Sequence, residues 1–155
     1  MTAGAAARGA PLNKPCHLCG FDGGEPVWRG EQLRVVRVED TPDHPAFYRV
    51  IWNAHVAEFS DLARDERQAC MEAVVRVERV LRDRLWPAKM NVASLGNMVP
   101  HLHWHVIPRF EGDAHFPYPV WAPAQRTSDA AELARLRKAL PELDRAVAAA
   151  MEGVR

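Results

Sequence analysis

Three histidines alternate with apolar residues in the segment HLHWHVI, which spans residues 101–107. Successive side chains leave a β-strand on opposite faces, so this spacing predicts a strand that carries His101, His103 and His105 on one face. The opposite face would carry the apolar residues Leu102, Trp104 and Val106. Neighbouring imidazoles disfavour one another's charged forms, and a purely structural use of all three is therefore a poor explanation. We expect one face of this strand to pack in the core and the other to carry chemistry.

Two chemistries fit three imidazoles on one strand face. A His-x-His pair can bind zinc, which takes three or four ligands, but the nearest acidic residue, Glu111, lies six residues past His105. A neutral imidazole can also attack phosphorus when its second nitrogen is anchored by a carbonyl or a carboxylate. The turn GNMVP, residues 96–100, directly precedes the strand and could donate backbone N–H groups to an anion. The residue pattern leaves metal binding and nucleophilic catalysis both open.

The rest of the chain predicts an α+β fold. β-Branched and aromatic runs predict short strands, at residues 26–29, 33–38, 46–55 and 89–96. Apolar residues at helical spacing predict a long helix over 65–85 and a final helix over 128–151, which Pro141 kinks or splits. This order of strands, helix, strands and helix predicts a mostly antiparallel sheet with one long central helix and a C-terminal helix.

Length and charge restrict the classes of protein and partner. A chain of 155 residues suits one domain, which we place at residues 15–125, after an Ala-, Gly- and Pro-rich leader over 1–14 that we expect to be disordered. Residues 126–155 would form a C-terminal helical extension. Basic and acidic residues number 20 each, and this zero net charge argues against binding to nucleic acid or to an anionic membrane. No apolar run approaches the roughly 18 residues of a membrane span, and we expect a cytoplasmic protein.

A second motif, CHLC, places Cys16 and Cys19 in a C-x-x-C pair near the N-terminus. Such a pair is half of a zinc site and needs two further ligands from elsewhere in the chain. A redox role would require a thioredoxin-like strand and helix around the pair, and the glycines that follow Cys19 argue against that context. Two unpaired surface thiols are the remaining interpretation. Three cysteines in all fit a reducing compartment better than a disulfide framework.

The histidine segment resembles the signature of the histidine-triad (HIT) superfamily, in which three histidines alternate with apolar residues. The context agrees: GNMVP directly before the triad, Pro-Arg directly after it, and a strand before the long helix that ends in His55. The resemblance covers residues 16–109 and is strongest to bacterial HIT proteins often described as diadenosine tetraphosphate hydrolases. It implies a HIT-like fold, a homodimer and a nucleotide substrate.

The resemblance implies a separate role for each histidine. His103, in the middle, would be the nucleophile that takes the nucleotidyl group as a covalent phospho-histidine adduct. His105 would contact the α-phosphate or the bridging oxygen. His101 would belong to the supporting network.

The resemblance also implies substrate-binding positions. Amides that face the phosphates would come from Asn91 and Asn97, and Glu39 or Asp40 would bind the ribose hydroxyls. Family members often have Gln followed by Ser or Thr in the turn, where this chain has Asn97 and Met98. The side chain of Met98 therefore offers no hydroxyl, and only its backbone N–H would donate a hydrogen bond to the phosphates. We expect Arg109 either on the surface or at the distal phosphates, and the aromatic segment HFPYPVW, residues 115–121, either against the sheet or beside the nucleotide pocket.

Some HIT proteins bind zinc through such a cysteine pair and two histidines. The matching residues here are Cys16, Cys19, His55 and His101. The resemblance thus implies a structural zinc ion that ties the N-terminal segment to the sheet, with no organic cofactor.

These observations predict a HIT-family hydrolase that attacks the α-phosphorus of a dinucleoside polyphosphate and forms an intermediate on His103. A phosphoramidase or a nucleotidyltransferase would use the same intermediate with another leaving group or acceptor. A nucleotide-binding module without catalysis is the alternative from a different class, and the intact triad argues against it.

Overall fold

The computed structural model describes residues 15–154, so the expected leader over 1–14 lies outside the described residues. Within the described residues, nine elements follow one another: α1 (His17–Gly20), β1 (Glu25–Arg29), β2 (Leu33–Arg37), β3 (Tyr48–Trp52), η1 (Phe59–Asp61), α2 (Arg64–Leu85), β4 (Lys89–Ala93), β5 (His103–Arg109) and α3 (Ala130–Ala150). The five strands form one sheet in the order β1-β2-β3-β5-β4, and every neighbouring pair is antiparallel. The α+β fold with a long central helix and a C-terminal helix is confirmed.

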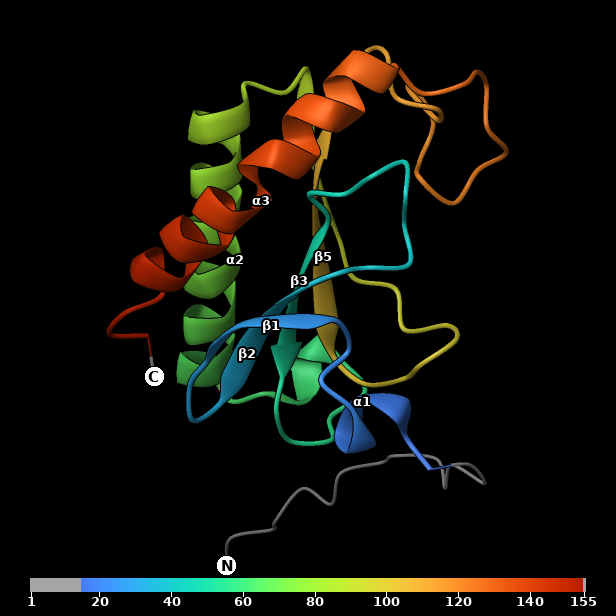
Figure 1. Cartoon of the computed structure of the whole chain (residues 1–155). Coiled ribbons are helices and arrows are strands. Elements are labelled where there is room, and N and C mark those ends of the chain that lie inside the picture. The colour runs from blue at the N-terminus through green and yellow to red at the C-terminus, as the bar shows by residue number, and fades with distance from the viewer. Residues whose placement is uncertain (1–14, 155) are drawn as a thin grey trace, which may run out of the picture.

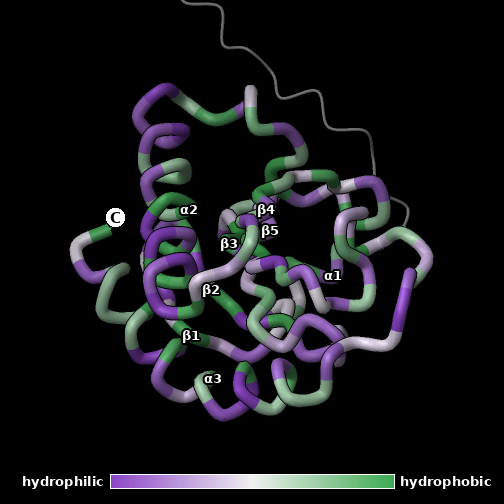
Figure 2. The backbone as a smooth tube through the Cα atoms, turned by 90° about the horizontal axis from the view of Figure 1, so that it is seen from above, coloured by the Kyte–Doolittle hydropathy of each residue, from purple (hydrophilic) through white to green (hydrophobic). Residues whose placement is uncertain are grey.

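The two faces of the sheet have different neighbours: α2 covers one face, and α1 packs on the other. Helix α2 packs against β3 and β5, while α3 crosses α2 and reaches β1 (Figure 1). Viewed from above, α2 and the short α1 lie on opposite sides of the strands (Figure 2). Alternation along β3 explains the division: Tyr48, Val50 and Trp52 join the main core, whereas Ile51 packs in a separate cluster with Leu18 of α1.

Helix α3 belongs to this core despite the proline inside it. The side chain of Asp129 caps the helix by accepting from the backbone N–H groups of Ala131 and Glu132 at 2.8 and 3.2 Å. Pro141 neither ends nor splits the helix, which continues to Ala150. The buried residues on its apolar face are Leu136, Leu143 and Val147. No helix in residues 15–154 is long and apolar enough to cross a membrane.

The histidine strand begins two residues later than its sequence pattern predicts. His101 lies in a bend, where its N–H donates to the carbonyl of Val99 at 2.8 Å, and β5 starts at His103. Leu102 instead pairs with the segment after β3: its N–H donates to the carbonyl of Val56 at 2.6 Å. The alternation of side chains nevertheless extends through this bend, because Leu102 and Val106 lie in the main core.

Candidate functional site

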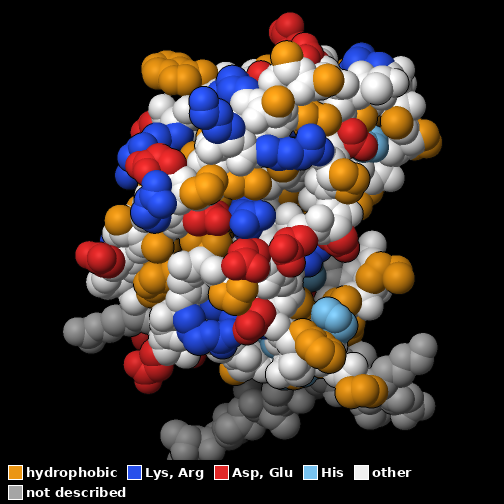
Figure 3. Space-filling view, viewed as in Figure 1, with side chains coloured by type: hydrophobic (Ala, Val, Ile, Leu, Met, Phe, Trp, Pro, Cys, Tyr) orange, Lys and Arg blue, Asp and Glu red, His pale blue; other side chains and the backbone are white. Residues whose placement is uncertain are grey.

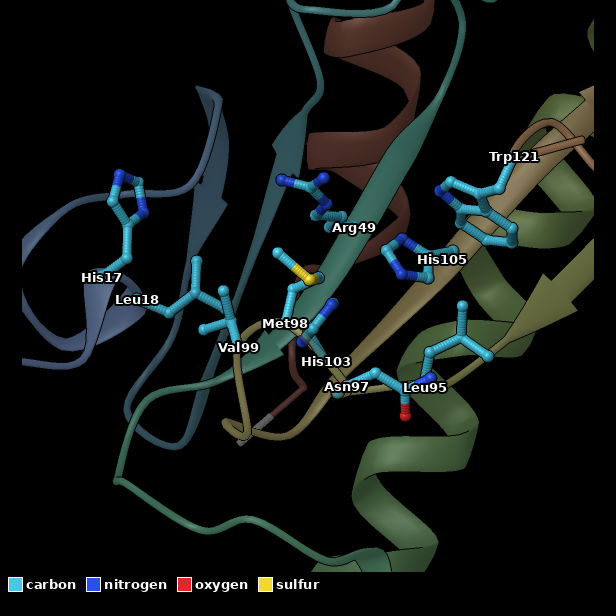
Figure 4. A pocket seen from close by; sticks show the side chains of 11 residues that line it. His17, Leu18, Arg49, Leu95, Asn97, Met98, Val99, His103, His105 and Trp121 are labelled. Atoms are coloured by element: carbon cyan, nitrogen blue, oxygen red, sulfur yellow. The ribbon is translucent and has the colours of Figure 1, made fainter. Parts of the chain in front are cut away.

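A pocket of about 420 Å³ lies on the sheet face opposite α2. The sheet contributes Arg49 from β3 and His103 and His105 from β5, as Figure 4 shows. The remaining lining comes from α1, from the loop between β4 and β5 and from the C-terminal segment: His17, Leu18, Leu95, Gly96, Asn97, Met98, Val99 and Trp121. Segments from both ends of the domain therefore close around two of the three triad histidines.

His103 is held in the tautomer that a nucleophile needs. Its side chain is buried, and its Nδ1 lies 2.6 Å from the backbone carbonyl oxygen of His101. A carbonyl oxygen only accepts, so Nδ1 carries the proton and Nε2 keeps its lone pair. Burial lowers the pKa of His103, and the nearby charge of Arg49 lowers it further. The ring is therefore neutral near pH 7, with Nε2 available for attack.

His105 is a second neutral imidazole in the same pocket. Burial is the main reason that its pKa falls to about 3, and His103 and Arg49 add to the effect. Its ring packs edge-on against Phe47 and Trp121, with centroids 5.3 and 5.0 Å away. Its Nδ1 is buried and has no partner among residues 15–154. A neutral ring in this position can donate one hydrogen bond to a phosphate or leaving-group oxygen.

His101 points away from the pocket, toward the two N-terminal cysteines. Its Nε2 donates to the carbonyl oxygen of Trp52 at 2.6 Å, and its Nδ1 lies 3.4 Å from the Sγ of Cys16 and 3.5 Å from that of Cys19. The Nδ1 of His55 lies 3.4 Å from the Sγ of Cys19. Ligand atoms of all four residues fall within 4.8 Å of one another.

This cluster fits tetrahedral zinc. Zinc–sulfur and zinc–nitrogen bonds of about 2.3 and 2.0 Å place sulfur and nitrogen about 3.5 Å apart at a tetrahedron's edge. The three sulfur–nitrogen distances match that value. The hydrogen bond from Nε2 of His101 to a carbonyl leaves Nδ1 unprotonated, as metal ligation requires. Cys16 and Cys19 are both free thiols.

The predicted substrate-binding residues fall into three groups. Asn97 and Met98 line the triad pocket. Glu39 and Asp40 line an adjoining hollow of about 400 Å³, which shares His17 and Arg49 with the triad pocket. In Figure 3, red acidic side chains border a recess in which blue and pale-blue side chains are visible.

Asn91 and Arg109, the third group, are not brought to either hollow. The buried guanidinium of Arg109 donates from Nε and Nη2 to the carboxylate of Asp113 at 2.8 and 3.0 Å. Its Nη1 donates to Oδ1 of Asn91 at 2.7 Å. In this arrangement Asp113 and Asn91 together accept from all three nitrogens of Arg109, and both Arg109 and Asn91 lie outside the linings of the two hollows.

Sequence reasoning missed Arg49 and left Trp121 undecided. Arg49 is the charged residue inside the otherwise apolar strand YRVIW, and that interruption was the available signal. Trp121 borders the pocket with its side chain about half exposed, and its neighbour Val120 packs against Val38, Phe47 and Ile107. The end of the aromatic segment therefore lies both beside the pocket and against the sheet.

Comparison with known proteins places this geometry in a family. The sequence profile of the HIT domain matches residues 29–112, more than half of the chain. Two curated relatives, both named AP-4-A phosphorylase and from two strains of Mycobacterium tuberculosis, are 32% identical over 81 residues. That alignment covers 48% of this chain and 42% of each relative, so the chain matches less than half of their length.

Solved structures agree in fold. A histidine triad protein from Bradyrhizobium japonicum is 28% identical with a TM-score of 0.66, and the match covers 81% of this chain and 92% of that one. A histidine triad protein from Marinobacter aquaeolei VT8 is 26% identical with a TM-score of 0.62, covering 79% and 89% of the two chains.

Proposed function

Because this chain belongs to the HIT domain family, whose activity is nucleotide processing, we propose that it cleaves nucleoside phosphate derivatives through a covalent nucleotidyl adduct on His103. The observation that carries this proposal is the buried, neutral imidazole of His103, whose Nδ1–H is anchored on the carbonyl of His101. The substrate class would be dinucleoside polyphosphates, in keeping with the name of the mycobacterial relatives.

The reaction would take place in two displacements. Nε2 of His103 attacks the α-phosphorus and forms a P–N bond, while the bond to the bridging oxygen breaks and the remaining nucleoside polyphosphate leaves as an anion. His105 donates a hydrogen bond to that oxygen or to the α-phosphate. An acceptor then attacks the same phosphorus, the P–N bond breaks and His103 is again neutral. Asn97, the backbone of Met98, and Glu39 or Asp40 would position the phosphate and the ribose.

The acceptor distinguishes hydrolysis from transfer. Water as acceptor gives a nucleoside monophosphate, and inorganic phosphate gives a nucleoside diphosphate. We propose hydrolysis, and phosphorolysis is the second candidate because the mycobacterial relatives are named phosphorylases. Diadenosine tetraphosphate should yield AMP and ATP in plain buffer. ADP and ATP formed only with added phosphate would support the second candidate instead.

Trapping the intermediate tests the proposal. We expect acid-labile labelling of one peptide, the one containing His103, when diadenosine tetraphosphate or adenosine 5′-phosphoramidate is mixed with the protein and quenched rapidly. Mass spectrometry should find the mass of one adenylyl group on it. Faster reaction with diadenosine tetraphosphate would indicate a polyphosphate hydrolase, and faster reaction with adenosine 5′-phosphoramidate would indicate a phosphoramidase. Tight nucleotide binding without an adduct from any substrate would instead indicate a binding module.

We also propose a structural zinc ion held by Cys16, Cys19, His55 and His101. The ion would join α1, which lines the pocket, to the bend that precedes β5. Metal analysis of purified protein should find stoichiometric zinc, and Cys16→Ser should lose it and lower the melting temperature. Cys70→Ser is the control for metal content, because Cys70 lies in the core on α2 and outside the cluster, so this variant should keep its zinc. Wild-type protein without stoichiometric metal would refute the zinc site.

We further propose a cytoplasmic homodimer. Strand β4 is an edge of the sheet, and beside it lies a hollow of about 800 Å³. Its lining is mainly apolar and includes Met71, Val74 and Val92, together with the polar residues Glu78, Lys89 and Asn91. An open edge strand with apolar neighbours is suited to pairing with a second copy. Light scattering should give twice the chain mass, and a monomer at micromolar concentration would contradict the dimer. The free thiols of Cys16, Cys19 and Cys70 are consistent with the cytoplasm.

A further inference from the structure

Arg49 occupies the centre of the functional face. It lies on β3 directly opposite His105 of β5 in the antiparallel register. Figure 4 shows its side chain beside the same opening as His103 and His105. Arg49 also lines the adjoining hollow that contains Glu39 and Asp40, so its guanidinium stands where the two hollows meet.

The hydrogen bonds of Arg49 are incomplete. Its Nη1 donates to the carbonyl oxygen of Gly23 at 3.0 Å, while its buried Nε has no acceptor among residues 15–154. Within that part of the chain, no carboxylate lies within 4.0 Å of its guanidinium. Burial lowers the pKa of Arg49, and the more distant charge of Asp40 opposes this effect. A partly buried cation with so few partners destabilises the empty protein.

Two buried arginines, Arg34 and Arg109, have structural roles instead. Arg109 has a carboxylate on two of its nitrogens and an amide oxygen on the third. Arg34 donates to three backbone carbonyls and to the side chain of Asn53. Both guanidinium groups are satisfied within the protein. Arg49 differs because its Nε has no acceptor among residues 15–154 and its side chain lines the triad pocket.

Arg49 also sets the charge of that pocket. Of the residues that line the pocket, taken from the described part of the chain, Arg49 alone carries a permanent charge. The guanidinium also lies 5.7 Å from the ring centroid of Phe47, which packs on His105. The cation is thus held in place beside the histidines.

We propose that Arg49 is a catalytic residue that binds the non-bridging oxygens of the phosphate attacked by His103. This inference rests on the proposed function and deepens it. A guanidinium offers planar, parallel N–H donors that match phosphate oxygens, and its charge stabilises the negative charge on those oxygens during displacement. The substrate class is therefore one whose reacting phosphorus carries at least one anionic oxygen.

Binding of AMP and of adenosine to Arg49→Gln tests this role by calorimetry. Glutamine can keep the hydrogen bond to the carbonyl of Gly23 but is neutral. We expect AMP affinity to fall on the order of 30-fold, because a charge-assisted hydrogen-bond pair is lost, while adenosine affinity stays within about twofold. Turnover should fall by at least the same factor as the affinity for AMP. The melting temperature of the ligand-free variant should be equal to or above that of wild type, because an incompletely paired cation has been removed.

Arg145→Gln is the matched control, since Arg145 is an exposed arginine on α3 that pairs with Glu142. It makes the same change in net charge and should leave AMP affinity unaltered. Arg49→Met provides a second neutral variant if Arg49→Gln does not fold. A folded neutral variant that binds AMP as tightly as wild type overturns the inference, as does an equal loss of AMP and adenosine binding. If no adduct forms on His103 but the AMP-specific loss is seen, the proposed reaction fails and the anion site stands.

Discussion

His103→Asn is expected to reduce turnover by about 10³-fold or more while leaving the protein folded. Asparagine removes Nε2, the nitrogen that we propose as nucleophile, and with it the covalent route. Its side-chain amide can still donate to the carbonyl of His101, the acceptor now used by Nδ1 of His103. The variant therefore separates loss of the nucleophile from loss of the anchoring hydrogen bond. Steady-state kinetics with diadenosine tetraphosphate and rapid-quench mass spectrometry provide the measurement.

His103→Ala should be equally inactive and somewhat less stable, since it leaves the buried carbonyl of His101 without its donor. Nucleotide affinity should change far less than turnover in both variants, because His103 is one of several groups in the pocket. A folded His103→Asn or His103→Ala protein with turnover within tenfold of wild type would remove His103 from the mechanism.

The second large effect concerns stability and the carboxylate of Asp113. This side chain accepts from Nε and Nη2 of Arg109 and from the backbone N–H groups of Phe110, His115 and Phe116. Asp113→Ala leaves a buried guanidinium without its counter-ion and three backbone donors without an acceptor. We expect a loss of about 3–5 kcal/mol in the free energy of unfolding, measured by urea denaturation.

Glu111→Ala is the control for Asp113→Ala, because Glu111 is an exposed acid on the same loop. It should change the free energy of unfolding by less than about 0.5 kcal/mol. An Asp113→Ala variant within about 1 kcal/mol of wild type would show that the ion pair does not hold the end of β5.

The same carboxylate contributes to stability against acid. Hydrogen bonds from Arg109 and the backbone lower the pKa of Asp113 to about 2, despite the opposing effect of burial. The unfolded chain binds a proton at this carboxyl below about pH 4, where the folded protein does not. Its stabilisation is therefore complete above about pH 4 and is lost as the pH falls toward 2. In Asp113→Asn the free energy of unfolding should depend less steeply on pH in that window.

His44 also makes the free energy of unfolding fall as the pH falls, but at a higher pH than Asp113. Burial lowers its pKa to about 4, so between about pH 6.5 and 4 the unfolded chain takes up a proton that the folded chain refuses. Stability should already decline over that range in wild type and in Asp113→Asn alike. Because the negative charge of Asp113 also raises the pKa of His44, the difference between the two proteins contains a contribution from His44 as well as that of Asp113.

Local patterns were sufficient for most of the elements. The β-branched run of β2 and the alternation in β5 reflect strand geometry, which is why these two strands fall within two residues of their predicted bounds. Strand β3 ends at Trp52, three residues before its predicted end at His55. The helical spacing of apolar residues likewise predicted α2. The bend at His101 was not predicted, because it arises from pairing of Leu102 with Val56, a contact between segments far apart in sequence.

The amino-acid sequence by itself determined the histidine strand, the two-sided character of that strand and the order of elements. The four-residue Cys and His cluster followed only from the resemblance to the HIT superfamily, and the tertiary structure brings its ligand atoms within 4.8 Å of one another. The tertiary structure decided which of two arginines faces the pocket. Arg109 follows the triad by four residues yet is buried in an ion pair with Asp113, whereas Arg49, 56 positions before His105, lies opposite it. The physical reason is strand register: pairing of β3 with β5 sets which side chains meet across the sheet, and that choice depends on packing of the whole domain.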